Sequence, residues 1–581
     1  MKMTENTDAG KICFWILVLV GVVSLVVFLG FGLFNTKGEP REAIVALSML
    51  QSGDWICPVN NGVDIAYKPP FFHWCVALCS LVAGHVTEFT SRLPSALATI
   101  LMVLVGYRSM LKNKVDCRLC LLTGLVTYTA FEVHRAGVNC RVDMMLSSMT
   151  VIAIYMFHGW YVSRRKWMIP LIILSMSAAA LTKGPVGIVL PCAVLGVYML
   201  VRRENFFRAF GVCLAFALAS CVLPLVWYCL AYQERGEAFL YLVYEENILR
   251  FTGKMAYSSH EAPAIYNVVT VVAGLLPYTL LLVVYPFTLR WRLPQNCLAK
   301  CKTFIKKMPH RISSMSDQDL LAFLSISIIF LFYCVPKSKR SVYLLPIYPF
   351  LAYYIARFIL FFSRKNRKAV VIYGNVLAVV VTVIPLMLAL VRAGVFSGIS
   401  FSGKHAAEYA AYMRVFGDIP YAYIVFFLLL ALSCGFMYRH FAKNGKSGYI
   451  LGYSLTGVVV SLYLVLDGLL LPSVYDVKSD YYVANEIRRL VPAGKIWDYR
   501  KDFVVGQRDR MHQFSINFYL GDRIVPLDQN RPKTGFLIMG DDDISTFVSS
   551  YPEYCVKKIR RFEHRSCDDK RTLTLYTFSK R

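Results

Sequence analysis

The feature that most constrains this chain is a series of long apolar segments that recurs from residue 12 to residue 471. A helix needs about 20 apolar residues to cross the ~30 Å hydrocarbon core of a bilayer. About thirteen segments fit such crossings: 12–34, 91–111, 117–131, 144–162, 167–181, 185–201, 209–232, 265–289, 320–335, 342–362, 369–390, 421–438 and 449–471. We therefore predict an all-α polytopic membrane protein over residues 1–471, with several spans that are unusually short.

The composition supports a membrane protein and argues against a soluble nucleic-acid-binding one. Of the 581 residues, 57% are hydrophobic and 17% are charged, whereas soluble domains have about 45–50% and about 25%. The net charge is +27. Because the basic residues alternate with apolar segments, membrane topology explains this charge, and no nucleic-acid partner is expected.

The distribution of Lys and Arg predicts which loops face the cytoplasm. One set of alternate loops is rich in basic residues, at 112–114, 164–166, 202–203, 290–311, 364–368 and 439–446. Such loops stay in the cytoplasm. An odd number of crossings then places residues 472–581 outside, where we expect a small soluble α/β domain with a helix at 479–490 and strands at 534–539 and 572–578. A disulfide between Cys555 and Cys567 is permitted there, and the sequence leaves it open.

Charged residues recur in the opposite loops and at the outer ends of the spans. The first loop, 35–70, contains an amphipathic segment at 43–50, and a second candidate segment follows it at 71–83. Both predict helices that lie along the membrane surface. The charged residues at this face include Glu39, Arg41, Lys68, Asp143, Lys183, Arg250, Lys339 and Arg340. Charges at this depth are costly unless they are paired or face water. The cations suit a lipid phosphate, and the carboxylates suit acid/base chemistry or metal binding.

Five motifs on this face resemble the membrane glycosyltransferases of the GT-C superfamily, which use polyprenyl-phosphate sugars. They are EPREA at 39–43 with GDW at 53–55 and KPP at 68–70, then RLPSA at 92–96, RVDM at 141–144, LTKGP at 181–185 and KRSVYLLP at 339–346. The chain is most similar to the aminoarabinose transferases that modify lipid A and to the related protein O-mannosyltransferases. The span count and the external α/β tail look like those of the aminoarabinose transferases.

The resemblance implies an inverting glycosyltransferase of the bacterial inner membrane, with its active face and tail in the periplasm. The donor would be a polyprenyl (undecaprenyl) phosphate sugar that enters from the surrounding membrane lipids. The acceptor would be lipid A or another envelope molecule. Lys68, Arg340 and Tyr343, together with Arg41 and Arg250, would stabilise the leaving phosphate. No nucleotide or organic cofactor is expected.

Glu39 and Asp143 are the carboxylates in these motifs that remain for catalysis. The family commonly has an Asp-Glu pair where this chain has Gly38-Glu39. We therefore expect Glu39 and Asp143 to face the donor sugar, with Asp143 the more important. The alternatives are an ion pair of Glu39 with Arg41, and a helix cap at Asp143 paired with Arg141.

A divalent metal is the cofactor that the resemblance suggests, with His260 as a ligand. His260 lies where the aminoarabinose branch has a His, but Tyr67 stands where that branch often has Glu, and a structural or solvated role for His260 is the alternative. A protein O-mannosyltransferase-like enzyme stays open as a second function. A transporter or flippase for a lipid-linked sugar is the rival of another class, because buried charges near helix ends also mark transport pathways.

Overall fold

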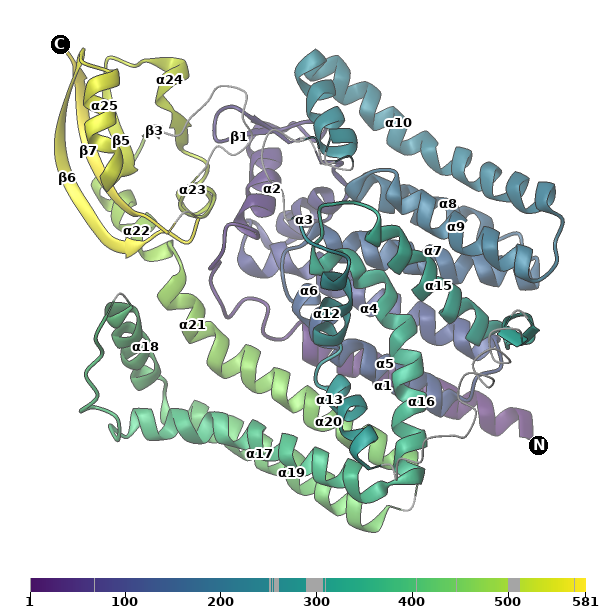
Figure 1. Cartoon of the computed structure of the whole chain (residues 1–581). Coiled ribbons are helices and arrows are strands. Elements are labelled where there is room, and N and C mark those ends of the chain that lie inside the picture. Colours follow the sequence, from purple (N-terminus) through teal and green to yellow (C-terminus); the bar gives the residue numbers. More distant parts are fainter. Residues whose placement is uncertain are drawn as a thin grey trace.

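The structure is a computed structural model that describes residues 2–581 apart from 67, 250, 251, 253, 255–260, 289–306, 309, 404, 446, 500–512 and 569. The chain folds into a bundle of long helices, with a small sheet domain at one end (Figure 1). Arg250 and His260 lie outside the described residues. The expectation of a metal at His260 therefore stays a prediction.

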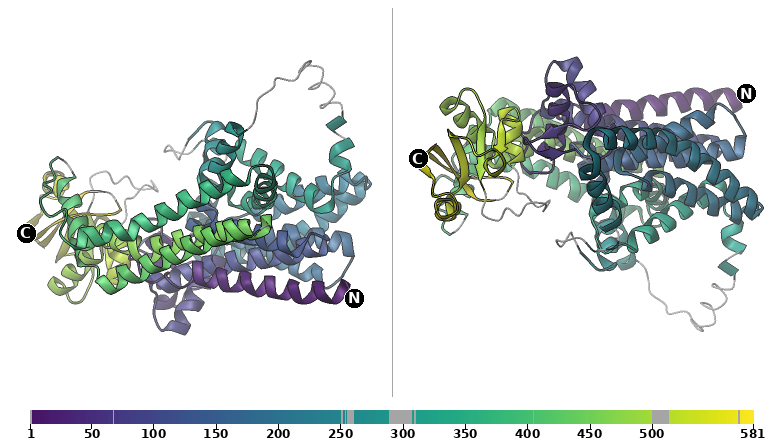
Figure 2. Two further views of the ribbon diagram at one scale, coloured as in Figure 1. Left: turned by 90° about the horizontal axis from the view of Figure 1, so that it is seen from below. Right: turned by 90° about the horizontal axis from the view of Figure 1, so that it is seen from above.

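Nine helices among the described residues are long and apolar enough to cross a membrane. They run between the end that holds the N-terminus and the end that holds the sheet domain (Figure 2). Three of them extend into neighbouring helical turns: α10 continues into η1, η2 (Ser341–Ile347) precedes α16, and η3 (Leu466–Leu470) with α21 (Leu471–Lys478) follows α20. The nine are α1 (Lys2–Leu25), α4 (Glu88–Lys112), α7 (Val142–Ser163), α10 (Phe206–Tyr244) with η1 (Glu245–Leu249), α15 (Asp317–Cys334), α16 (Tyr348–Lys365), α17 (Arg367–Arg392), α19 (Tyr421–Asn444) and α20 (Gly448–Val465).

The other four predicted spans are short or bent. They correspond to α5 (Cys117–Thr129), α8 (Met168–Lys183), α9 (Val186–Val201) and the pair α12 (Ile265–Gly274) and α13 (Tyr278–Phe287), which is bent by 100°. At 13 to 16 residues, the first three are about 20–24 Å long, less than the ~30 Å core. Every predicted span thus overlaps a helix, while thirteen crossings remain a prediction.

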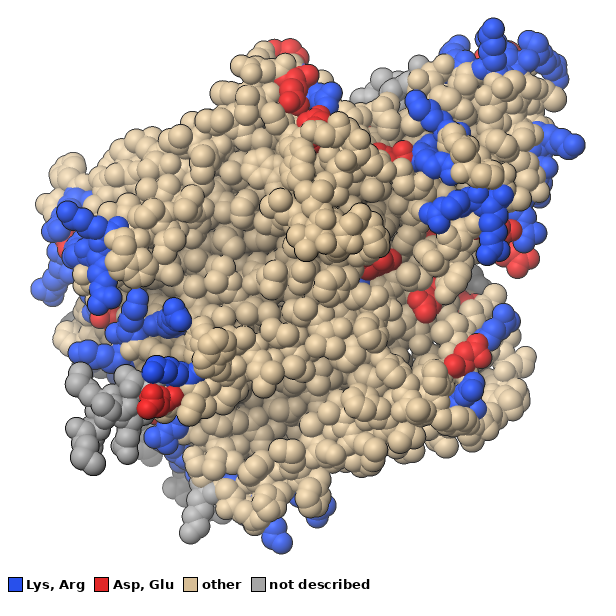
Figure 3. Space-filling model, turned by 180° about the vertical axis from the view of Figure 1, so that it is seen from behind, with Lys and Arg blue, Asp and Glu red and all other residues tan. Residues whose placement is uncertain are grey.

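Charged residues gather mainly at the two ends of the molecule. In Figure 3, uncharged residues form a broad band, and Lys and Arg gather at the N-terminal end and over the tail. At the N-terminal end the loops are joined by polar contacts. Arg202 pairs with Asp317 at 2.7 Å, and Arg357 pairs with Asp319. The basic loops that the structure describes, at 112–114, 164–166, 202–203, 364–368 and 439–445, thus lie at the N-terminal end. The described candidate site residues lie at the other end.

Short elements cover the tail-side end of the bundle. They are α2 (Pro40–Ser52), the hairpin β1 (Val59–Asn60) and β2 (Asp64–Ile65), α3 (Phe71–Ala83), α6 (Phe131–Gly137) and α18 (Ala406–Asp418). The helices predicted at 43–50 and 71–83 are confirmed as α2 and α3. The apolar side of α3 packs with α2 and α4, which buries Phe72 and Val76 among Ala46 and Ala98.

The tail is a mixed α/β domain, as predicted. Its sheet has the order β4-β3-β5-β7-β6, in which β3 is parallel to β4 and β5, and β7 is antiparallel to β5 and β6. Its elements are α22 (Tyr481–Leu490), β3 (Ile496–Tyr499), α23 (Phe514–Leu520), β4 (Ile524–Pro526), α24 (Leu527–Asn530), β5 (Thr534–Gly540), η4 (Asp541–Asp543), α25 (Ile544–Ser550), β6 (Tyr554–Arg565) and β7 (Thr572–Lys580). Cys555 and Cys567 are both free thiols.

The tail is attached to the first loop by buried polar and apolar contacts. The Asp522 carboxylate accepts hydrogen bonds from the Asn61 backbone N–H at 2.8 Å and from the Ser48 hydroxyl at 3.0 Å. The Tyr519 hydroxyl accepts from the Phe34 N–H at 2.9 Å. Ile44 of α2 is packed in one apolar cluster with residues of α22 and α23. These contacts fix α2 between the membrane helices and the tail.

Candidate active site

The centre of the candidate site is Glu42, in the first turn of α2. Its buried carboxylate pairs with Arg41 at 2.9 Å and with Lys68, which reaches it from the loop before α3. On the other side, His73 Nε2 of α3 lies 3.0 Å from Glu42 Oε2. The other ring nitrogen of His73 is buried without a partner among the described residues, which fits a ring that carries its proton on Nε2. Glu42 therefore joins two of the predicted phosphate-binding cations.

The electrostatics of this group keep Glu42 ionised and make Lys68 easy to deprotonate. Burial would raise the pKa of Glu42, but Lys68, Arg41 and His73 together hold it well below its usual range. Burial and the nearby charge of Arg41 lower the pKa of Lys68 to about 8, although Glu42 opposes that change. Lys68 is therefore a cation near neutral pH that loses its charge in mildly alkaline solution.

A second charged pair joins Asp143 to Lys183. Asp143 lies in the first turn of α7 and Lys183 is the last residue of α8, so each charge is favourable at its helix end. Their side chains form an ion pair. The Lys183 ammonium lies 4.4 Å from the ring centroid of Tyr343 in η2. In this arrangement the ion pair with Lys183 holds the side chain of Asp143.

The two charged groups belong to one site. Lys183 is near enough to contribute to the lowered pKa of Lys68. The structure thus connects Lys68 and Arg41 to Asp143 and Tyr343, residues that belong to three of the five motifs. Like charges this close favour an anion between them, because a phosphate would accept hydrogen bonds from several cations.

Glu39 has a different environment from the one expected. It pairs with the buried Arg92 of α4, at 2.8 Å to Nε and 3.1 Å to Nη2, and it also accepts the Cys140 backbone N–H at 2.9 Å. Arg41, the alternative partner, pairs with Glu42 instead. Glu39 therefore links the start of α2 to α4 and to the loop before α7.

Arg340 lies at the beginning of η2 and is half-buried. Its backbone carbonyl accepts the Tyr343 N–H at 3.1 Å, so both residues belong to one turn. Across the described part of the chain, no group of three or more His, Cys, Asp or Glu residues is arranged to hold a metal ion. This finding does not include His260.

Sequence reasoning assigned no role to Glu42 or His73, and it named Lys183 only as one of the cations at this face. The sequence did contain a sign that Glu42 is buried. Glu42 lies on the same side of α2 as Val45 and Ala46, one helical turn later, and Met49, two turns later. A carboxylate on the apolar side of an amphipathic helix must be paired. His73 and Lys183 interrupt apolar segments in the same way.

Part of the chain matches a known family. Residues 67–228 match the family described as dolichyl-phosphate-mannose-protein mannosyltransferase. This region contains Lys68, Asp143 and Lys183. It includes neither the first half of the candidate site, around Glu42, nor the tail.

Similar proteins carry the name undecaprenyl phosphate-alpha-4-amino-4-deoxy-L-arabinose arabinosyl transferase. One, from Proteus mirabilis, is 26% identical over 66% of this chain and 66% of its own length. Another, from Edwardsiella ictaluri, is 27% identical over 63% of this chain and 62% of its own length. The alignment thus spans slightly less than two thirds of each relative.

The fold resembles the crystal structure of ArnT from Cupriavidus metallidurans bound to undecaprenyl phosphate. The TM-score is 0.67 at 20% identity, and the match covers 96% of this chain and 97% of the other. The fold likeness includes the helical bundle and the tail, since nearly the whole of both chains is matched. The expected resemblance to GT-C glycosyltransferases, and to the aminoarabinose transferases among them, is confirmed.

Proposed function

We propose that this chain is an inverting glycosyltransferase that moves a sugar from a polyprenyl-phosphate donor to an envelope acceptor, with lipid A the first candidate. The observation that carries the proposal is the cluster of the half-buried cations Arg41, Lys68 and Lys183 with the buried carboxylates Glu42 and Asp143. Its cations suit a lipid phosphate, and its carboxylates suit a sugar. The names of the relatives and the ligand of the ArnT structure support this donor class.

In the proposed reaction the acceptor oxygen attacks the anomeric carbon while the bond from that carbon to the phosphate oxygen breaks. The leaving lipid phosphate takes up the negative charge. Arg41 and Lys68 stabilise it, and Arg340 and Tyr343 complete its contacts from η2. Before the donor binds, the Glu42 carboxylate pairs with both Arg41 and Lys68. When the donor binds, its phosphate replaces this carboxylate as the partner of the two cations.

The carboxylate that the family commonly places at position 38 is supplied, we propose, by Glu42. Gly38 lies in the turn that leads into α2, and Glu42 lies one helical turn further on. Residues four apart on a helical path share a face. Asp143 would hydrogen-bond the sugar or, where the acceptor is a hydroxyl, take up the proton of that hydroxyl as the new bond forms. Where the acceptor is itself a phosphate, no base is needed, because the nucleophile is already an anion.

The active face and the tail lie, in this proposal, on the periplasmic side of the inner membrane. The Lys- and Arg-rich loops share the opposite end, which is the pattern of a cytoplasmic side. Single cysteines at positions 165 and 365 should react only with permeant reagents, and cysteines at 54 and 245 should react with impermeant ones. The reverse labelling would overturn the orientation.

The test of the activity is release of polyprenyl phosphate from a polyprenyl-phosphate sugar by the purified protein. Lys68→Ala should remove most turnover, whereas Lys37→Ala, at an exposed site of the same loop, should keep it. Mass spectrometry of lipid A and of envelope proteins, from cells with and without the gene, identifies the acceptor. Movement of intact donor across vesicles without bond cleavage would favour the flippase.

A further inference from the structure

Tyr333 is a buried tyrosine beside the candidate site, and neither the sequence motifs nor the proposed reaction uses it. It lies in the last turn of α15. That helix begins at the N-terminal end of the bundle, where Asp317 pairs with Arg202, so its last turn lies at the tail-side end. The Tyr333 ring is packed in the main apolar core and is 9% exposed. Its phenol adds an O–H donor to a segment that is otherwise apolar.

The Tyr333 ring belongs to one group with Tyr343 and Lys183. The rings of Tyr333 and Tyr343 are stacked, with 5.6 Å between their centroids and 27° between their planes. The Lys183 ammonium lies 4.4 Å from the centroid of the Tyr343 ring. The Tyr333 hydroxyl is also near enough to interact electrostatically with Tyr343 and Asp143. Tyr333 therefore lies beside the second charged pair, although it comes from a different membrane helix.

The end of α15 is fixed by a buried amide. Asn267 of α12 is 2% exposed, and its Nδ2 donates to the Tyr333 carbonyl at 3.0 Å and contacts Cys334 Sγ at 3.5 Å. The core encloses the Tyr333 ring at the same time. Because the backbone and the ring are both held, a ligand of the Tyr333 hydroxyl would meet a donor that is already ordered, which lowers the entropic cost of binding.

The hydroxyls of Tyr333 and Tyr343 have no hydrogen-bond partner in the part of the chain that the structure describes. A buried tyrosine usually directs its O–H to an acceptor, so the Tyr333 hydroxyl needs an explanation. The Lys183 ammonium carries three N–H donors, and among the described residues its side chain bonds to Asp143. These three residues thus offer more donors than the described protein groups accept.

An ionised phosphate is the ligand that fits such a group. Its oxygens accept hydrogen bonds and donate none, and its charge is opposite to that of Lys183. We propose that the Tyr333 hydroxyl donates a hydrogen bond to the phosphate of the polyprenyl-phosphate donor, beside Tyr343. The inference rests on the proposed function, which supplies this phosphate. The same hydrogen bond would stabilise the negative charge that the phosphate gains when its bond to the sugar breaks.

The test compares a phosphate with an alcohol on the same lipid. Purified full-length protein is mixed with equal amounts of undecaprenyl phosphate and undecaprenol, and native mass spectrometry gives the ratio of the two retained lipids. Tyr333→Phe keeps the ring and removes only the hydroxyl. We expect the preference for the phosphate to fall roughly tenfold, the factor that a hydrogen bond to a charged group supplies. Because both lipids compete in one sample, this ratio does not depend on the folded fraction.

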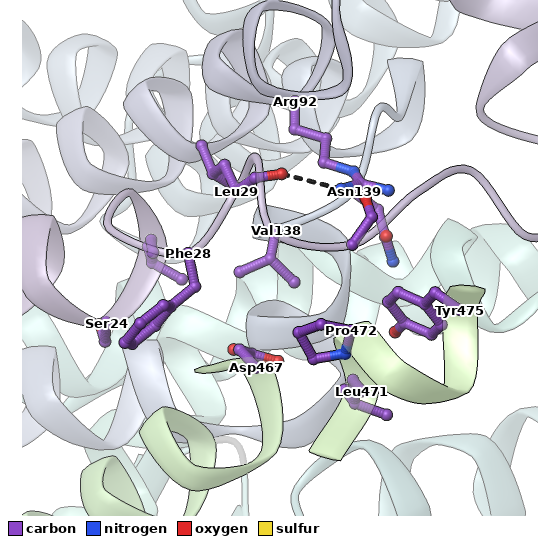
Figure 4. Close-up of a pocket in the computed structure, with 12 residues that line it drawn as sticks. Ser24, Phe28, Leu29, Arg92, Val138, Asn139, Asp467, Leu471, Pro472 and Tyr475 are labelled. Atoms are coloured by element: carbon purple, nitrogen blue, oxygen red, sulfur yellow. Dashed lines mark hydrogen bonds between the residues drawn. The ribbon is translucent and has the colours of Figure 1, made fainter. Parts of the chain in front are cut away.

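Tyr475→Phe is the matched control. Tyr475 lines a cavity with Asp467 and Asn139 (Figure 4), and the lining of that cavity includes neither Tyr333 nor Tyr343. Loss of the Tyr475 hydroxyl should therefore leave the preference for the phosphate unchanged. Tyr343→Phe removes the neighbouring hydroxyl of the proposed phosphate site and should lower the preference by a factor similar to that of Tyr333→Phe.

The outcomes distinguish this inference from the proposed function. If Tyr333→Phe keeps the native preference while Lys68→Ala loses it, the phosphate binds without Tyr333 and the inference is wrong. An equal loss in Tyr475→Phe would also overturn it, because a hydroxyl outside the site would then have the same effect. A native protein that retains both lipids equally would contradict the phosphate site as a whole. If Tyr333→Phe lowers the preference but the native protein releases no polyprenyl phosphate from a polyprenyl-phosphate sugar, the contact stands and the transfer reaction is refuted.

Discussion

Glu42→Gln is the substitution that best tests how the charges of the candidate site are coupled. Glu42 is the group that opposes the lowering of the pKa of Lys68, which is about 8. A hydrogen bond to a charged group contributes roughly 1.5–3 kcal/mol, and 1.36 kcal/mol corresponds to one pH unit. Removing the carboxylate should therefore lower the pKa of Lys68 by roughly one to two pH units.

The lower pKa of Lys68 in the variant should change how donor binding depends on pH. Lys68 binds a phosphate only when protonated, so affinity falls as pH rises through the pKa of Lys68 in the free protein. In the native protein this decline should be centred near pH 8, and at pH 7.5 about three quarters of Lys68 would be charged. In Glu42→Gln about a quarter or less would be charged at that pH. The variant should bind weakly there and regain affinity toward pH 6.5, where no carboxylate competes for Lys68.

The assay is titration of the purified protein with undecaprenyl phosphate between pH 6.5 and 9.5, above the second ionisation of the phosphate at about pH 6. The matched control is Lys68→Arg, in which the alkaline decline should vanish because a guanidinium stays protonated. A decline that keeps its midpoint in Glu42→Gln would refute the coupling of Glu42 to Lys68. A decline that persists in Lys68→Arg would assign it to another group.

Three further substitutions test the surrounding ion pairs. Asp143→Asn should remove most turnover in the transfer assay and leave the melting temperature nearly unchanged, because Asn keeps the shape but loses the charge beside Lys183; a native rate would contradict this role. Glu39→Gln should lower the free energy of unfolding by roughly 3–5 kcal/mol, because it leaves Arg92 as an uncompensated buried charge; a loss below about 1 kcal/mol in an unfolding titration would be inconsistent with that. Asp522→Ala should cost about 1–3 kcal/mol and speed hydrogen exchange in α2; unchanged protection would show that the tail does not hold this helix.

The membrane architecture was predictable because apolar length is a local property. Each of the thirteen predicted segments overlaps a helix, and the short ones at 117–131 and 167–181 are short in the structure as well. The bend between α12 and α13 was not predicted, because the segment was assigned as one span by its length, without using Pro277 at the break as a signal for a kink. Apolar length alone does not reveal where a helix changes direction.

The partners of the charged residues were much harder to predict than their presence. Lys68 and Asp143 are conspicuous because each interrupts a motif or an apolar segment. The pairing of Glu39 with Arg92 joins residues 53 positions apart, and no local pattern distinguishes it from a pair with Arg41. Which carboxylate meets the cations depends on how α2 is oriented, and that orientation depends on contacts with the tail.

The attachment of the tail to α2 also affects when this part of the protein can finish folding during its synthesis. Ser48 and Asp522, which hydrogen-bond each other, are 474 residues apart in the chain. At 5–20 residues per second, a ribosome needs roughly 25 to 95 s to supply the second partner after the first. During that time α2 lacks its contacts with the tail, and Glu42 lacks the support that these contacts give to its helix. A polypeptide that is cut short before the tail would thus hold a full set of membrane helices but an unfinished site.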